Sequence, residues 1–167
     1  EYVDKRIKEI SLETGEPVYF ANYNGPGQVV ITGSKKGVRR VCKALKAEGA
    51  RRAVPLPIAG SFHSPYMDEA GVKLGKIINS TVFNNPELPI YQCVDGKRHI
   101  DPIKIKSNLI QHITSPVHWT SMVNNMVSDG ITDFYECGTD DTLQKIVSRM
   151  YPDALVKSIW DISYYKK

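Results

Sequence analysis

Residues 18–33 read VYFANYNGPGQVVITG, and this stretch decides the first part of the fold. Val18 to Tyr23 is rich in aromatic and β-branched residues, and residues 28–33 form a second run of the same kind. The turn cluster Asn24-Gly25-Pro26-Gly27 separates them. Glycine adopts positive φ without steric cost and asparagine tolerates it. The stretch therefore predicts two antiparallel strands joined by a hairpin turn.

Helical spacing flanks the hairpin on both sides. Before it, apolar residues recur three or four positions apart until Gly15; they are Val3, Ile7 and Ile10. After it, Ser34 is an expected N-cap for a helix that runs to about Glu48, and Gly49 is its expected stop. The apolar stripe of this second helix consists of Val38, Val41, Cys42 and Leu45.

Arg51 to Leu56 is predicted as a third strand. Residues 1–57 then read helix–strand–strand–helix–strand, which is the ferredoxin-like order without its first strand. Such a sheet keeps an unpaired edge. Residues 58–167 change to longer α/β alternation, so we expect a small α+β subdomain followed by a larger α/β subdomain.

The elements expected in residues 58–167 alternate in type. Helices are predicted at Tyr66–Ser80, Pro102–Ile113 and Val117–Ser128, and a last helix is predicted after its expected cap, Thr139. Strands are predicted at Pro89–Val94, Ile131–Cys137 and Ala154–Ile159. The tail Tyr164–Lys167 is expected to be loose in solvent.

Composition sets the broad class. Apolar residues make up 41% and charged residues 24%, as is ordinary for a soluble globular protein. No apolar run approaches the roughly 20 residues of a membrane span, and no secretory signal opens the chain. A cytoplasmic location without membrane contact is the expectation. Because Cys42, Cys93 and Cys137 are scattered, we expect reduced, mostly buried thiols and no metal site.

Residues 55–67 read PLPIAGSFHSPYM and hold the main catalytic candidate. A predicted strand leads into a glycine-bearing loop that presents His63 before the next helix, and catalytic side chains often occupy such loops. On this pattern alone, a satisfied loop or core histidine is the favoured interpretation of His63. Asn22 and Asn24 likewise fit ordinary turn chemistry.

Four segments, taken in order, resemble the malonyl-CoA:acyl-carrier-protein transacylases. They are NYNGPGQVV at 22–30, GARR at 49–52, LPIAGSFHSPYM at 56–67 and TSPVHW at 114–119. The resemblance extends over essentially the whole chain. It implies that a ferredoxin-like subdomain, here incomplete, is followed by the C-terminal part of an α/β-hydrolase-like acyltransferase core.

The resemblance also implies an activity. Members of the family transfer a malonyl group from coenzyme A to the phosphopantetheine thiol of acyl carrier protein, for fatty acid biosynthesis. A serine in a Gly-x-Ser-x-Gly elbow attacks the thioester while a histidine takes its proton. By position that histidine resembles His63, and the backbone carbonyl of His112 resembles the group that orients it. The His112 side chain is expected at the surface. No cofactor is implied beyond the coenzyme A thioester, which is substrate.

Five further residues are implied in substrate binding. Phe62, directly before the histidine, resembles the residue that favours malonyl over methylmalonyl groups, because its ring fills the space of an α-methyl branch. Asn22 and Asn24 resemble asparagines that face the cleft, where they bond acyl or pantetheine amides or support the wall. Arg51 and Arg52 suit coenzyme A phosphates or acidic carrier-protein residues, and a solvated basic pair fits them equally well.

No Gly-x-Ser-x-Gly occurs in the chain. The resemblance therefore implies that the serine-bearing N-terminal half is missing and is a third partner beside malonyl-CoA and acyl carrier protein, and that the chain alone is inactive. The alternative is a non-catalytic ferredoxin-like module that binds acyl carrier protein. Nucleic acid is not expected as a partner, since the aromatic signature of RNA-binding sheets is missing. Where the family has Gly-Pro-Gly, residues 138–140 read GTD.

Overall fold

The structure is a computed structural model that describes residues 2–159. In chain order the elements are α1 (Tyr2–Thr14), β1 (Val18–Gly25), β2 (Gln28–Gly33), α2 (Lys35–Ala47), the 3₁₀ turn η1 (Pro65–Met67), α3 (Asp68–Ser80), β3 (Ile90–Gln92), β4 (Lys97–His99), α4 (Pro102–His112), α5 (Trp119–Ser128), β5 (Asp133–Glu136), α6 (Thr142–Met150) and β6 (Leu155–Ser158). The predicted loose tail lies outside the described residues.

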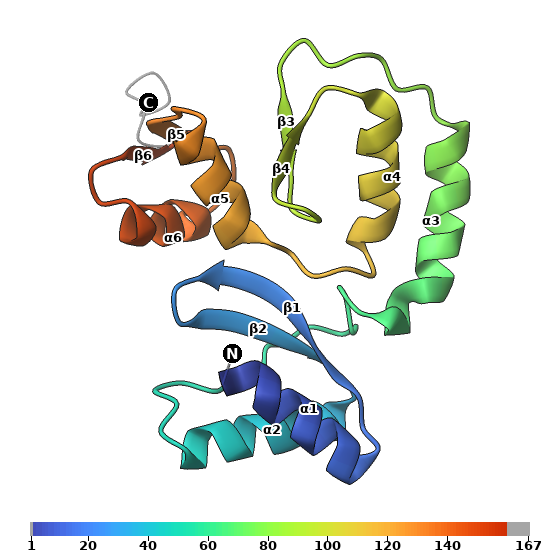
Figure 1. The fold of residues 1–167 in the computed structure, drawn as a ribbon, viewed down its shortest axis with the longest axis vertical. Coiled ribbons are helices and arrows are strands. Elements are labelled where there is room, and N and C mark those ends of the chain that lie inside the picture. Colours follow the sequence, from blue (N-terminus) through green and yellow to red (C-terminus); the bar gives the residue numbers. More distant parts are fainter. Residues whose placement is uncertain (1, 160–167) are drawn as a thin grey trace.

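The predicted hairpin is confirmed. β1 and β2 pair antiparallel from Val18 opposite Gly33 to Gly25 opposite Gln28, with two irregularities in β1. Gly27 has a φ of 72°, which the tight turn requires. Figure 1 shows α1 and α2 on one side of this hairpin and α3 to α6 on the other.

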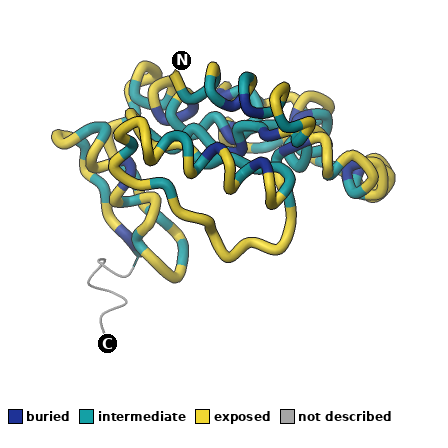
Figure 2. The backbone as a smooth tube through the Cα atoms, turned by 90° about the horizontal axis from the view of Figure 1, so that it is seen from below, coloured by how far each residue is buried: buried dark blue, intermediate teal, exposed yellow. Residues whose placement is uncertain are grey.

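The side of the hairpin that faces α1 and α2 carries a hydrophobic core. Its buried members are Ile7, Ile10, Val18 and Val41. Each helix turns one side toward the core, so buried and exposed positions alternate along the helices in Figure 2. The predicted cap of α2 is also confirmed, since the Ser34 hydroxyl accepts a hydrogen bond from the Gly37 amide at 2.9 Å.

Two short sheets build the remainder. β5 and β6 pair in parallel, with α6 as the crossover between them. β3 and β4 pair antiparallel around Gly96, whose φ is 67°. We did not predict β4, although Asp95-Gly96 is a strong hairpin signal. α3 packs against α4 at Gly75, which has no side chain to keep Ile110 away, and Gly71 faces Ile113 and Thr114 just after α4.

Two predictions are wrong. Arg51 to Leu56 is not a strand: these residues have no pairing partner among the described residues, and an extended segment without a ladder neighbour forms no sheet. Thr139 does not cap α6 either. The N-cap is Asp141, and the Glu136 carboxylate accepts from the amides of Leu143 and Gln144 at 3.1 and 2.8 Å, so the first turn is satisfied from β5.

The α/β class is confirmed, whereas the ferredoxin-like order and the boundary at residue 57 remain predictions. None of the described helices is both long and apolar enough to cross a membrane. Within residues 2–159, no three His, Cys, Asp or Glu side chains are grouped to hold a metal ion. Cys42 and Cys93 are partly buried, which raises their pKa values, but Cys137 is exposed, contrary to expectation.

Candidate functional site

The loop that carries His63 is fixed from two sides. The Ser61 hydroxyl donates to the carbonyl of Gly33 at the end of β2, at 2.9 Å, and the His63 amide donates to the carbonyl of Ile113, also at 2.9 Å. The hydroxyl of Ser64, which is fully buried, closes the loop on the Ser61 carbonyl at 2.5 Å. These bonds hold His63 at a φ of 60°, the only positive φ of a non-glycine residue in the described chain.

The imidazole of His63 is oriented by backbone carbonyls. Its Nδ1 lies 2.9 Å from the carbonyl oxygen of His112 and 3.2 Å from that of Ser115. Carbonyl oxygens only accept, so Nδ1 carries the proton and Nε2 keeps its lone pair. No hydrogen bond to Nε2 is found from residues 2–159. The ring is half-buried, and its free nitrogen is an acceptor for a proton.

The two carbonyls come from one segment, where α4 ends and the chain turns toward β1. Pro116 disfavours helix for the residue before it, so α4 does not continue past this turn. The chain then runs parallel to β1: the Val117 amide donates to Ala21 at 2.7 Å and the Tyr23 amide donates to Val117 at 2.9 Å. The hairpin therefore supports the segment that orients His63.

The side chain of His112 lies beside His63 and is partly buried, whereas we had expected it at the surface. The two ring centroids are 5.2 Å apart with an interplanar angle of 41°. The Nε2 atom of His112 is buried, and none of the described residues is its hydrogen-bond partner. Burial lowers the pKa of His112, and the charge of a protonated His63 lowers it further. The lowered pKa favours the neutral form of the His112 ring beside His63.

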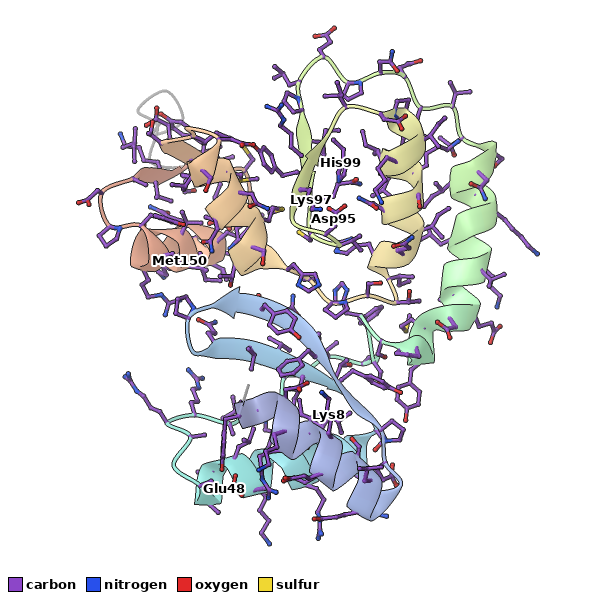
Figure 3. The ribbon with its side chains drawn as sticks, viewed as in Figure 1. Lys8, Glu48, Asp95, Lys97, His99 and Met150 are labelled. Carbon is purple, nitrogen blue, oxygen red and sulfur yellow. The ribbon has the colours of Figure 1, made fainter. Side chains whose placement is uncertain are left out.

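A buried polar network fixes α4, one turn before His112. The Asn108 amide nitrogen lies 2.9 Å from Gln92 Oε1 and 3.1 Å from Asp95 Oδ2, and His99 Nε2 lies 2.9 Å from the same Asp95 oxygen. Figure 3 shows Asp95 and His99 on the β3–β4 hairpin, beside α4. Burial alone would raise the pKa of Asp95, but hydrogen bonds from the Lys97 amide, Asn108 and His99 outweigh it and lower the pKa.

The other predicted site residues are spread around this centre. Asn22 bridges to Val117 through the backbone, next to the segment that orients His63, and Asn24 lies nearer the hairpin turn. Phe62 is 44% exposed, and its ring lies so close to Gly60 that a Cβ there would be 3.0 Å from it.

Arg51 and Arg52 lie on the segment that follows α2. Both side chains are exposed, and no hydrogen bond or ion pair joins either to a described residue. The structure thus brings His63, His112 and Asn22 together around one segment, whereas this arginine pair is not joined to that centre.

Sequence reasoning missed three contributors. Ser115 supplies the second carbonyl, and the rings of Tyr23 and His118 stack with centroids 5.2 Å apart at an angle of 9°. Tyr23 also accepts, through its carbonyl, a hydrogen bond from Thr120 at 2.9 Å. All lie within or beside the TSPVHW and NYNGPGQVV segments, so the motifs marked the place without showing the contacts.

The chain matches a known protein family. The model of the acyl transferase domain family matches residues 3–159. The malonyl CoA-acyl carrier protein transacylase of Bacillus subtilis (strain 168) is 33% identical over 146 residues, which are 87% of this chain and 46% of that protein. The resemblance inferred from the four segments is confirmed.

Solved structures agree with these relatives. An acyl-carrier-protein S-malonyltransferase from Burkholderia pseudomallei 1710b superposes with a TM-score of 0.92 at 30% identity, over 99% of this chain and 53% of that one. A complex of a type II PKS acyl-carrier protein with its malonyl-transacylase gives 0.85 at 32% identity, over 93% and 49%. The chain spans about half the length of the relatives it matches.

Proposed function

Since the chain belongs to the acyl transferase domain family, we propose that it supplies the general base for transfer of a malonyl group from coenzyme A to the thiol of acyl carrier protein. The observation that carries the proposal is the His63 imidazole, which is held at Nδ1 by the carbonyls of His112 and Ser115 while no described residue bonds its Nε2. The relatives' names supply the reaction, and they favour it over a non-catalytic carrier-binding module.

The proposed reaction has two halves, both centred on His63 Nε2. A serine hydroxyl from outside this chain gives its proton to Nε2 and attacks the thioester carbonyl. The coenzyme A thiolate leaves and takes that proton, which yields a malonyl-serine ester. The carrier thiol then gives its proton to Nε2 and attacks the ester, and the serine recovers the proton. A Ser–His dyad can suffice without a carboxylate behind the ring, because a thiolate leaves more readily than an amine.

The remaining site residues have proposed roles around the acyl chain. Phe62 restricts the space beside the malonyl α-carbon, which disfavours a methyl branch. Asn22 and Asn24 bond pantetheine or acyl amides or support the wall behind them. Arg51 and Arg52 face solvent, where phosphates of coenzyme A or carboxylates of the carrier would suit them.

We also propose that activity requires a serine-bearing segment equivalent to the N-terminal half of the relatives. The chain contains no Gly-x-Ser-x-Gly, and Arg51 to Leu56 pairs with no strand among the described residues, with Val54 and Leu56 exposed. A strand from the serine-bearing segment would pair with it and complete a ferredoxin-like sheet. We call the assembly of this chain with such a segment the completed enzyme.

The test uses the completed enzyme and labelled malonyl-CoA. Malonyl transfer to holo-acyl carrier protein should fall by a factor on the order of a thousand in His63→Ala. His112→Gln is the matched control, because it keeps the carbonyl that bonds His63, so transfer should stay at the same order as in the parent. Activity that is indifferent to His63→Ala would remove the catalytic assignment. Absence of malonyl transfer in the parent enzyme would remove the proposed function itself.

A further inference from the structure

The surface of α2 is cationic throughout. Its sequence, KKGVRRVCKALKA, has no acidic residue, and its basic residues are Lys35, Lys36, Arg39, Arg40, Lys43 and Lys46. Neighbouring α1 is different, because its acidic and basic residues alternate and form pairs such as Lys8 with Asp4 at 2.6 Å. We call the exposed basic face of α2 the basic ridge.

The basic ridge is not neutralised within the described chain. Lys36 pairs with Glu16 at 3.5 Å, and no ion pair to the other five is found among residues 2–159. Lys35 and Arg39, and Arg39 and Lys43, are spaced four residues apart, where like charges repel and destabilise a helix. The helix therefore keeps a repulsion that an anionic partner would relieve.

The ridge is hollowed and begins close to the His63 loop. Five of its residues line an open depression of about 420 Å³: Lys35, Lys36, Arg39, Arg40 and Lys43. α2 starts two residues after Gly33, whose carbonyl binds the Ser61 hydroxyl, and Ser61 is two residues from His63. The first turn of α2 is therefore joined to the His63 loop through Gly33 and Ser61.

We infer that the basic ridge is the docking surface for an acidic face of the acyl carrier protein, an inference that rests on the proposed function. The cations from Lys35 to Lys46 extend over about 16 Å of helix, at 1.5 Å per residue. A row of carboxylates on a protein surface matches that length better than one cluster of phosphates. Single-stranded nucleic acid is disfavoured, because α2 has no aromatic residue on which bases could stack.

The test reverses two charges in the completed enzyme, Arg39→Glu together with Lys43→Glu. Both residues are exposed, and the buried Val41 between them is unchanged. The matched control, Lys76→Glu with Lys104→Glu, makes the same change in net charge at exposed positions of α3 and α4. We expect KM for holo-acyl carrier protein to rise about tenfold in the ridge variant. Higher salt should raise the parent's KM for holo-acyl carrier protein toward that of the ridge variant, because salt screens the charges.

Two further measurements distinguish a defect in carrier docking from a general loss of activity. Transfer to free pantetheine should be equal in parent, variant and control, and KM for malonyl-CoA should not change. The inference is overturned if the ridge variant resembles the control, or if KM rises for malonyl-CoA and not for the carrier. If the double variant fails to fold, the neutralising pair Arg39→Gln with Lys43→Gln replaces it. A parent that transfers malonyl to neither acceptor refutes the proposed function, which is a separate result.

Discussion

The hairpin with α1 and α2 and the body formed by residues 64–159 are stabilised in different ways. The first, which we call the hairpin unit (residues 2–50), gathers its buried apolar residues into one cluster around Val41. In the body, buried apolar residues are distributed over several elements, and the best-buried large side chains include Asn108 as well as Val123. The body also exposes Ile77 and Ile103. The buried apolar residues of the hairpin unit therefore form one cluster, whereas the body combines apolar residues spread over several elements with a buried polar network.

The largest effect should come from Gly33→Ala, which attacks the hairpin unit at its backbone. Gly33 has a φ of 148°, and a Cβ there would lie 2.5 Å from the carbonyl oxygen of Pro17. Backbone cannot yield as a flexible side chain does, so the free energy of unfolding should fall by about 3 kcal/mol or more. Urea denaturation measures it. The control is Gly15→Ala, which also has positive φ but meets nothing within 4 Å and should cost less.

Val41→Ala tests whether the cluster holds the hairpin unit together. Val41 is fully buried among Ile7, Ile10 and Val18. Removing two methyl groups there should lower the free energy of unfolding by about 2–3 kcal/mol, through lost transfer energy and the cavity left behind. Thermal unfolding would report the loss. A cost below that of an exposed substitution would mean that the cluster is not the source of stability.

Asn108→Ala is the corresponding test in the body. The change leaves Gln92 and Asp95 without their shared donor, which should cost about 1–3 kcal/mol. The second readout is malonyl transfer by the completed enzyme, because Asn108 fixes the helix whose last carbonyl holds His63. A kcat that falls with no change in KM for malonyl-CoA would support positioning. An unchanged kcat would separate the network from the site.

Asp95 gives the body a pH dependence that the apolar cluster lacks. Its pKa is lowered in the folded chain, so it contributes stability above its unfolded pKa of about 3.9 and loses that contribution as pH falls through the lower folded value. The advantage of the parent over Asp95→Asn in urea midpoint should therefore be full at pH 6 and shrink below about pH 4. A difference between the two that does not vary from pH 6 to pH 3 would contradict this account.

Features that depend on sequence neighbours could be predicted, whereas features that depend on distant residues could not. Local signals sufficed for the hairpin, for the Ser34 cap and for the apolar stripe of α2, because each depends on neighbours in sequence. Arg51 to Leu56 has the composition of a strand, but pairing requires a second strand that these signals do not supply. The same limit applied to the site. The resemblance pointed to His63 and to the carbonyl of His112, but the Ser115 carbonyl and the partly buried ring of His112 follow from how α4 ends against β1.

The smallest effect should come from Ile77→Ala on α3, and it distinguishes a free apolar surface from a core. Ile77 is 64% exposed, while the adjacent Ile78 is 9% exposed. In this chain Ile77→Ala should change the free energy of unfolding by no more than about 0.5 kcal/mol, whereas Ile78→Ala should cost about 2 kcal/mol or more. In the completed enzyme the cost of Ile77→Ala should grow if the serine-bearing segment covers α3, because the same methyl groups would then leave a cavity. An equal and negligible cost in both would show that this face of α3 stays in solvent and that the body's open surface there has no structural partner.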